Sequence, residues 1–560
     1  MSSTRPSKTT TIGSGVDAPL GSGRPGAGVP SARPRAGRVA FVGAGPGDPG
    51  LLTVRAAQYL ARADVVVTDQ VNREDFVARH ARPGVRVLDA GHGEHGQVLT
   101  HASRAKLVVT AARAGGLVVR IMDGDPAMFN GLAEEATALA KAGIPFEVVP
   151  GVSAVSAVPT YAGIPLTSAN SSAVHVISAT DTNVDWALSA SDSVTVVVLG
   201  NPERLTRALG CLLAAGRDPS TLVALTERGT TTTQRTHTCT LGSVGDELAD
   251  RVRFPTLAVI GSTVALREQL SWFESKPLFG WHVLVPRTKE QAGTVIAQLE
   301  TYGATGEVVP TISVEPPRTP QQMERAIKGL VTGRYEWIGF TSVNAVRAVR
   351  EKFDEFGLDA RAFAGLKIAA VGDVTAQALR EWGLAPDLIP SGEQSATGLL
   401  EDWPDYDPLL DPINRVLLPR ADIATDTLCA GLQAMGWEVD DVTAYRTVRA
   451  APPAAEVREA IKAGRYDAVI FTSSSTVRNL VGIAGKPHTS TVIACIGPAT
   501  AKTAEEHGLR VDVLPAEPSV DALVDALAEY GVSLALTAAQ AGQPASRPSV
   551  RKSSARRKAT

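Results

Sequence analysis

Short apolar runs alternate with helix-like stretches from residue 37 to about residue 274. The runs are rich in Val, Leu and Ile, which is typical of buried β-strands. Between several of them lie stretches such as T-V-R-A-A-Q-Y-L-A-R, whose apolar positions repeat at helical spacing. The predicted strands are 39–42, 65–68, 118–121, 146–149, 174–177, 194–199, 222–225 and 257–260. This alternation predicts an α/β fold.

A second α/β unit begins with a predicted strand at 282–286, after a linker at 275–280. This unit contains an internal repeat, because two motifs recur in the same order. F-T-S-V-N-A-V-R-A-V resembles F-T-S-S-S-T-V-R-N-L, and V-G-D-V-T-A-Q-A-L-R-E-W-G-L resembles I-G-P-A-T-A-K-T-A-E-E-H-G-L. The repeat predicts two similar lobes that the chain crosses between twice. We expect the lobes at 281–315 plus 452–531 and at 316–450.

Composition narrows the class of protein. A chain of 560 residues is too long for one core. The net charge of -3 argues against binding of nucleic acid by bulk electrostatics. The four cysteines are scattered without a C-x-x-C motif, so we predict no metal site and a cytoplasmic location. No apolar run reaches the ~18 residues of a membrane span, so we expect no membrane partner. We expect disordered segments at 1–37 and, with a basic composition, at 538–560.

The stretch V-A-F-V-G-A-G-P-G-D-P-G-L-L-T, residues 39 to 53, carries the strongest chemical signal. Gly43, Gly45 and Gly47 allow backbone N–H groups to approach a ligand at a strand-to-helix turn. Asp48 stands where a dinucleotide fingerprint would have its third glycine, which favours a small ligand with a positive centre. An NAD-dependent oxidoreductase with an appended binding module stays an alternative, because Asp69 lies about twenty residues further on.

The repeated motifs of the second unit end strands with Thr or Ser and then open helices. Such helix N-termini suit a polyanionic ligand, although each hydroxyl could equally be a simple N-cap. The candidate binding residues are Thr341, Ser342, Thr472, Ser473, Ser474, Gly497 and Thr500. Tyr445, in T-A-Y-R-T, could donate a proton to a leaving hydroxyl or could be a packed hinge aromatic.

The first unit resembles the tetrapyrrole methylases, in particular the uroporphyrinogen-III C-methyltransferases. The resemblance covers about residues 38–274, as two subdomains at 38–150 and 151–274. The matching motifs are V-G-A-G-P-G-D-P-G-L-L-T, A-D-V-V-V-T-D, G-D-P-A-M-F, A-G-I-P-F-E-V-V-P-G-V-S-A, Y-A-G-I-P-L-T and A-L-R-E-Q-L-S-W-F. It implies S-adenosylmethionine bound between the two subdomains.

Carried over to this chain, the resemblance assigns the proton acceptor to Asp69, although a strand-end cap is the alternative. Arg120 would pair with substrate carboxylates. The implied cofactor-binding residues are Pro46, Asp123, Gly124, Asp125, Met128, Ser153, Ala154, Leu199 and Gly229.

The chain departs from this family pattern at several positions. The stretch D-A-G-H-G-E-H-G has Gly91 about where the family has a lysine proton donor, and His92 could substitute. Met122 and Asp123 replace a Lys and a Gly, and Gly131 replaces an arginine. An alternative is therefore a degenerate or regulatory methylase half. His92, Glu94, His95 and His101 could be metal ligands, but their glycine-rich setting favours a mobile lid over a metal site.

The second unit resembles uroporphyrinogen-III synthase over about residues 280–531. The motifs are F-T-S-x-x-x-V-R, L-L-P-R-A-D-I-A, V-T-A-Y-R-T and I-G-P-A-T-A. The resemblance implies cyclisation of hydroxymethylbilane to uroporphyrinogen III without a cofactor, with Tyr445 as candidate acid. Arg287, at a strand end, would add charge to the site, with surface pairing as the alternative. We therefore expect a bifunctional tetrapyrrole enzyme. A homodimer through the methylase half is a possible assembly.

Overall fold

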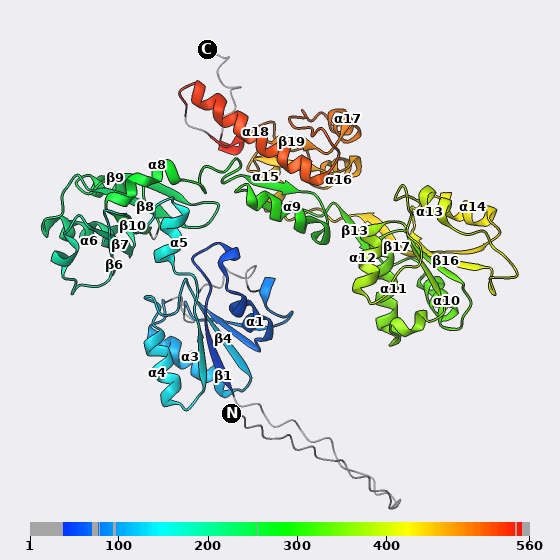
Figure 1. Ribbon diagram of the computed structural model, residues 1–560, viewed down its shortest axis with the longest axis horizontal. Coiled ribbons are helices and arrows are strands. Elements are labelled where there is room, and N and C mark those ends of the chain that lie inside the picture. The colour runs from blue at the N-terminus through cyan, green and yellow to red at the C-terminus, as the bar shows by residue number, and fades with distance from the viewer. Residues whose placement is uncertain are drawn as a thin grey trace, which may run out of the picture. The chain divides into compact units, whose positions relative to one another are not determined.

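The computed structural model describes residues 37–69, 77, 79–92, 97–254, 256–543 and 546–550. The chain divides into two compact units, Met1–Ala157 and Val158–Thr560. Its described strands form four separate sheets, two of which are purely parallel. Each sheet is packed between or against helices, as the α/β prediction requires (Figure 1).

The first unit has a parallel sheet in the order β3-β2-β4-β1-β5. Alternate side chains of β1 enter two cores: Ala40 and Val42 face α1, while Val39 and Phe41 face α3 and α4. The strands are β1 (Arg38–Gly43), β2 (Val65–Thr68), β3 (Arg86–Asp89), β4 (Leu117–Met122) and β5 (Phe146–Val149). The helices are α1 (Val54–Arg62), α3 (His101–Arg113) and α4 (Leu132–Lys141), followed by α5 (Ala154–Tyr161) at the boundary between the units.

The second sheet is mixed, in the order β6-β7-β10-β8-β9. Strand β10 runs antiparallel to both of its neighbours and is buried throughout. Its strands are β6 (Ala173–Ser178), β7 (Val194–Gly200), β8 (Leu222–Glu227), β9 (Arg235–Thr240) and β10 (Thr256–Ile260). The helices α6 (Pro202–Ala214) and α7 (Val244–Asp250) pack on it, and the short α8 (Arg267–Leu270) follows.

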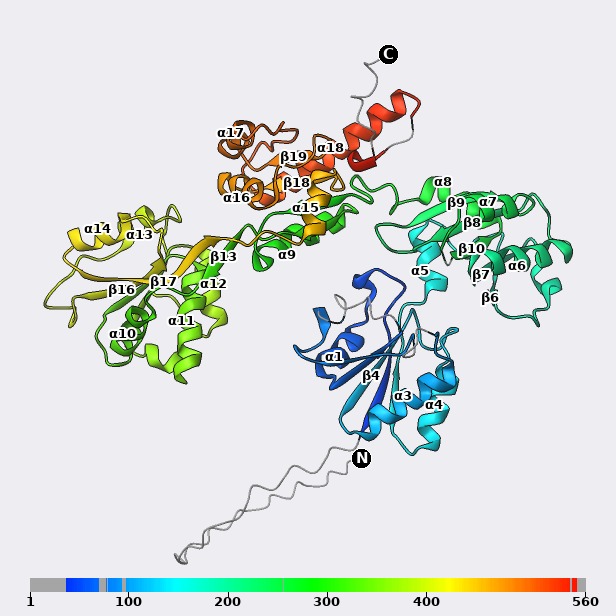
Figure 2. The ribbon, with the colours of Figure 1, turned by 180° about the vertical axis from the view of Figure 1, so that it is seen from behind.

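The third sheet is parallel, in the order β12-β11-β18-β19, and joins segments far apart in the sequence. Helices α9 and α18 share one core of this sheet, while α15, α16 and α17 share another (Figure 2). The strands are β11 (His282–Val285), β12 (Thr305–Val308), β18 (Ala468–Phe471) and β19 (Val492–Cys495). The helices are α9 (Lys289–Thr301), α15 (Ala455–Lys462), α16 (Ser474–Ala484), α17 (Pro498–Glu506) and α18 (Val520–Gln540).

The fourth sheet has the order β13-β17-β16-β14-β15, and only β13 is antiparallel to its neighbour. The strands are β13 (Ile312–Glu315), β14 (Trp337–Phe340), β15 (Lys367–Ala370), β16 (Arg415–Ala421) and β17 (Glu438–Arg449). Helices α10 (Pro320–Val331), α11 (Val343–Phe356) and α12 (Asp373–Glu381) share one core, and α13 (Ala396–Asp402) and α14 (Thr427–Ala434) share another.

The sequence repeat is also a structural repeat. In the fourth sheet Phe340 of β14 pairs with Ala370 of β15, and in the third sheet Phe471 of β18 pairs with Cys495 of β19. In both cases the first strand leads to a serine N-cap and the second to a glycine N-cap in extended conformation. The two motifs therefore build the same carboxyl edge in each sheet.

One expectation about the C-terminal segment needs correction, and another stays untested. Among the described residues, α18 is long and apolar enough to cross a membrane by length and composition alone, so the expected absence of a membrane partner stays a prediction. It packs on α9, where Asp525 accepts hydrogen bonds from Tyr302 Oη at 2.8 Å and Gln298 Nε2 at 2.9 Å. The expected disordered tail from 538 is ordered in part, because Ser549 N–H donates to buried Asp467 at 2.9 Å.

All the strands predicted by residue range are present. Between residues 37 and 274, β3 and β9 were missed, and beyond residue 286 no strand range was predicted. Strands β3 and β9 lie at sheet edges and are largely polar or exposed, so they lack the apolar run that marks a central strand.

Candidate active sites

Three loops meet at the carboxyl edge of the first sheet, after β1, β4 and β5. Gly43, Gly124 and Gly151 bring these backbones together, since a Cβ on Gly43 would lie 2.6 Å from the Gly124 oxygen and from Gly151 Cα. Gly45 and Gly124 exchange backbone hydrogen bonds of 3.2 and 2.9 Å. Pro46 follows directly in the first loop. The glycines therefore fix a backbone-lined site at the edge where α/β sheets bind ligands.

The second loop is held by its own polar side chains. Asp125 accepts the Gly151 N–H at 3.0 Å and the Ala127 N–H at 2.8 Å. Asn130 Nδ2 donates to the carbonyls of Asp123 and Asp125, both at 2.6 Å. The carboxylate of Asp125 thus fixes the loops, and Asp123 is exposed. Contact of either residue with a cofactor stays a prediction.

Unusual backbone conformations lie beside predicted cofactor residues. Among the described residues, the non-glycine positions with positive φ are Phe129 at 60°, Arg228 at 49° and Thr230 at 65°. Phe129 follows Met128, and the other two flank Gly229. Such strain costs of order 1–3 kcal/mol and gathers at ligand sites. The backbone thus marks both segments as candidate functional loops.

The other predicted cofactor residues lie near element ends. Ser153 Oγ accepts the Val155 N–H at 3.2 Å at the start of α5, which begins with Ala154. Leu199 is half-buried near the end of β7. Gly229 is needed sterically, since a Cβ there would overlap Val158. The roles of these residues toward a cofactor stay predictions.

Asp69 directly follows β2 and belongs to a cluster of charged side chains. Arg120 Nη2 donates to its two oxygens at 2.9 and 3.0 Å, and Arg104 Nε lies 3.5 Å from Oδ1. Arg120 also contacts Glu135 at 2.8 Å, and both of these side chains are fully buried. Burial alone would lower the pKa of Arg120, but the hydrogen bonds and charges of Glu135 and Asp69 raise it.

This arrangement corrects the expected role of Arg120. Its nitrogens are engaged with Asp69, Glu135 and the carbonyl of Ile121, and its side chain is inaccessible. Arg120 therefore supports Asp69 and does not pair with substrate carboxylates. The sequence reasoning missed Glu135 and Arg104. A charged residue at a core position of the α4 pattern was the available signal for Glu135.

The structure also explains why position 91 carries no side chain. A Cβ on Gly91 would overlap the carbonyl oxygen of Asp69, so a lysine cannot stand there in this backbone. His92 is exposed, with Nδ1 3.9 Å from Asp89 Oδ2. Its proposed donor role stays a prediction. At Gly131 the imidazole of His101 occupies the space that a Cβ would need.

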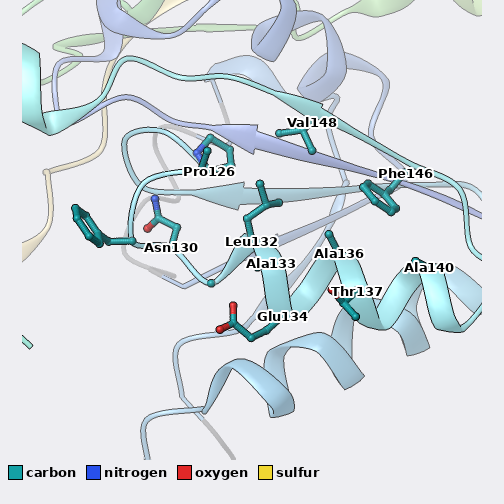
Figure 3. Close-up of a pocket in the computed structure, with 13 residues that line it drawn as sticks. Pro126, Asn130, Leu132, Ala133, Glu134, Ala136, Thr137, Ala140, Phe146 and Val148 are labelled. Atoms are coloured by element: carbon teal, nitrogen blue, oxygen red, sulfur yellow. The ribbon is translucent and has the colours of Figure 1, made fainter. Parts of the chain in front are cut away.

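An apolar groove of about 570 Å³ lies between the 126–134 segment, α4 and β5 (Figure 3). Phe129, Phe146 and Val148 line it and are partly exposed. Glu134 is the one charged residue of its lining. A groove without cations does not suit a substrate rich in carboxylates. Within the described residues no group of three His, Cys, Asp or Glu side chains could hold a metal, and Glu94 and His95 lie outside them.

The fourth sheet places Tyr445 beside Ser342. The two hydroxyls are 2.9 Å apart, and Ser342 Oγ also accepts the Ala345 N–H at 3.1 Å as the N-cap of α11. Tyr445 is 7% exposed. The register between β16 and β17 shifts next to it, at Arg420 and Ala421, and such irregularities often re-aim a side chain at an active site. Thr341, just before Ser342, is half-buried.

In the third sheet the corresponding hydroxyls mainly serve the helices. Ser473 is the N-cap of α16 in a capping box with Thr476. Ser474 Oγ donates to the Ala499 carbonyl at 3.0 Å and so ties α16 to α17. Thr472, half-buried, precedes them. These contacts agree with the N-cap interpretation and leave binding by the backbone as a prediction.

Gly497 is the N-cap of α17. Thr500 is only 4% exposed, so direct contact between Thr500 and a substrate is not supported.

Arg287 follows β11 and is half-buried. Burial lowers the pKa of Arg287, and no carboxylate among the described residues contributes to that shift. Arg420, by contrast, is paired with Asp441. Arg287 is therefore the better candidate for an anionic ligand.

Comparisons with known proteins divide the chain between residues 245 and 294, as the sequence motifs predicted. The model of the Tetrapyrrole (Corrin/Porphyrin) Methylases matches residues 38–245, and that of Uroporphyrinogen-III synthase HemD matches residues 294–525. Porphyrin biosynthesis protein HemD of Ruminiclostridium josui is 31% identical over 506 residues, which cover 88% of this chain and 98% of that protein.

Two further relatives each match less than half of the chain. Siroheme synthase 2 of Aeromonas hydrophila is 41% identical over 254 residues, 44% of this chain, and the chain spans 53% of that protein's length. Uroporphyrin-III C-methyl transferase of Thermus thermophilus, solved with S-adenyl homocysteine, is 34% identical, with 41% of this chain and 93% of that chain covered and a TM-score of 0.35.

These matches define an enzyme of tetrapyrrole biosynthesis with a methylase half followed by a synthase half. The chain belongs to the family of the porphyrin biosynthesis protein HemD. Two enzymatic halves, which methylate and cyclise, are supported over the synthase-only alternative. Because both halves match tetrapyrrole enzymes, the alternative of an NAD-dependent oxidoreductase with a binding module is not supported.

Proposed function

We propose that the first half transfers methyl groups from S-adenosylmethionine to uroporphyrinogen III, towards precorrin-2, with Asp69 as proton acceptor. The observation that carries this proposal is the position of Asp69 directly after β2. It is 26% exposed there and is held by Arg120, at the same sheet edge as the glycine loops. A carboxylate fixed in this way can accept the proton that a ring loses when one of its carbons is methylated.

The loops fit this cofactor better than a nucleotide phosphate. The segments 43–52, 123–131 and 150–154 contain no Lys, Arg or His, while Asp48 and Asp123 bring negative charge. S-adenosylmethionine supplies a sulfonium, which is already a strong methylating electrophile. The residues then contribute mainly by alignment of the reacting partners and by taking up the proton. Pro46, Gly124, Met128, Ser153 and Ala154 are proposed to contact it, chiefly through backbone groups.

For the second half we propose cyclisation of hydroxymethylbilane to uroporphyrinogen III. Tyr445 would donate a proton to the leaving hydroxyl, supported by its 2.9 Å contact with Ser342. Ser342 suits this role because its oxygen accepts the Ala345 N–H, which leaves its own O–H free to donate to Tyr445. The substrate's carboxylates would be held by Arg287, Thr341 and the helix N-termini of both lobes.

The remaining parts of the proposal are coarser. We propose methylase limits of 38–274, synthase limits of 281–531 and a cytoplasmic location. A homodimer through the methylase half and a synthase half that needs no cofactor complete the proposal.

The first test uses the whole chain with Asp69→Asn and a matched exposed control, Glu203→Gln on α6. We expect Asp69→Asn to keep binding of radiolabelled S-adenosylmethionine but to lower methyl transfer by about 10²–10⁴-fold. The control should keep both. Methyl transfer that survives in Asp69→Asn would place the acceptor elsewhere.

A further inference from the structure

Asp69 is the accessible end of a charge-balanced group of four side chains. Arg120 Nε donates to Glu135 Oε2 at 2.8 Å, and Nη2 donates to Glu135 Oε1 at 3.0 Å as well as to Asp69. Arg104 completes the group from α3. Two cations and two carboxylates give no net charge.

Exposure increases in order along this group. Glu135 and Arg120 side chains are 0% exposed, Arg104 is 16% and Asp69 is 26% exposed. A buried Arg–Glu pair is a weak source of stability, because desolvation offsets its attraction. The effective dielectric constant is low in the interior, however, so a buried carboxylate interacts more strongly with neighbouring charges than a carboxylate at the surface does.

We propose that Glu135 is a positioning residue for methyl transfer, acting on Asp69 through Arg120. The proposal rests on the proposed function of Asp69. Glu135 fixes the guanidinium of Arg120 through two hydrogen bonds, so that Nη2 faces both oxygens of Asp69. It also neutralises part of the charge of the Arg120 guanidinium that faces Asp69.

The contacts also identify the accepting atom. Oδ1 of Asp69 faces both Arg120 and Arg104, whereas Oδ2, within the part of the chain that the structure describes, is in contact with Arg120. The ring carbon gains the methyl group as the carbon–sulfur bond breaks, and that bond's electron pair leaves on sulfur. The proton that the methylated ring then loses is taken up by Oδ2.

The charge balance predicts two opposite effects on the pH profile of methyl transfer. Glu135→Gln leaves an excess positive charge beside Asp69, which favours its ionised form and makes it a weaker base. Arg104→Gln leaves an excess negative charge, which has the reverse effect. Among the described residues, other titratable groups at this edge are Asp89 at the end of β3, His92 beyond it, and Asp123 and Asp125 after β4. Asp89 Oδ1 accepts the Gly91 N–H at 2.6 Å.

The test measures kcat/KM for methyl transfer against pH in the full chain, with Glu134→Gln as the matched exposed control on α4. We expect Glu135→Gln to move the acid limb down by about one pH unit and to lower kcat by about tenfold. Arg104→Gln should move the limb up, by a smaller amount because it is more exposed. The control should leave the limb in place.

Binding of S-adenosylmethionine reports whether the methylase half of each variant is folded, and ring closure by the same chain reports on the synthase half. If Glu135→Gln does not bind the cofactor, Glu135→Asp decides the question: it keeps the charge but shortens the side chain that holds Arg120, so we expect a lower kcat with the limb in place, and an unchanged kcat would overturn the role of Glu135. Limbs that do not move, or that move in the same direction, would overturn the role of Glu135 while leaving that of Asp69 intact. Retained turnover in Asp69→Asn would instead overturn the proposed function.

Discussion

Replacement of Tyr445 by Phe tests the synthase half at its best-defined contact. The ring is 7% exposed and Phe has the same shape, so the core of the lobe should be preserved. Ser342 keeps its hydrogen bond with the Ala345 N–H, so the lost hydroxyl pair should cost only about 1 kcal/mol of unfolding free energy. If the hydroxyl donates the proton to the leaving group, the rate of enzymatic closure should fall about 10²-fold or more.

A second buried tyrosine of the same lobe provides the matched control. Tyr335 is 3% exposed, and its hydroxyl donates to Asp440 at 2.7 Å. Tyr335→Phe therefore loses a comparable or stronger hydrogen bond away from Ser342.

The assay supplies hydroxymethylbilane and separates the type I and type III rings after oxidation to porphyrins. In Tyr445→Phe, spontaneous closure should compete, and type I should accumulate. Tyr335→Phe should still form type III, even if its melting temperature falls by more. Equal type III rates in the two variants would refute the role of Tyr445 as acid.

Two further substitutions test local packing and charge. Gly91→Ala should lower methyl transfer and cost about 1–3 kcal/mol of stability, because the added Cβ would overlap the carbonyl oxygen of Asp69. Methyl-transfer kinetics and thermal unfolding would check this, and unchanged kinetics would contradict it. Hydrogen bonds from His282 and Tyr466 lower the pKa of Glu307. Its contribution to the free energy of unfolding is therefore present above its ordinary pKa of 4.5 and is lost as the pH falls through the lowered pKa. Unfolding midpoints measured from pH 6 to pH 3 should fall less steeply in Glu307→Gln, and parallel curves would argue against this coupling.

The central strands could be predicted from sequence because burial on both faces imposes an apolar run. The chain's polar edge strands, β3 (Arg86–Asp89) and β9 (Arg235–Thr240), do not carry that signal. The repeated motifs predicted the same edge in two sheets, which the shared register confirms.

The candidate site was only partly accessible from sequence. The positions of Asp69 and Tyr445 follow from strand ends, which a local pattern can locate. The partnership of Arg120 with Glu135 depends on how α4 packs on β4, which no local pattern contains. Arg120 was therefore expected at the substrate, whereas the structure buries it beneath Asp69.

The most direct test of the account is incubation of the whole protein with hydroxymethylbilane, with and without S-adenosylmethionine, followed by mass and isomer analysis of the products. Without the methyl donor we predict uroporphyrinogen III alone. With it we predict the same ring carrying added methyl groups. A type I ring in both reactions, or a type III ring whose mass never increases, would contradict the conclusion that one chain both closes and methylates the macrocycle.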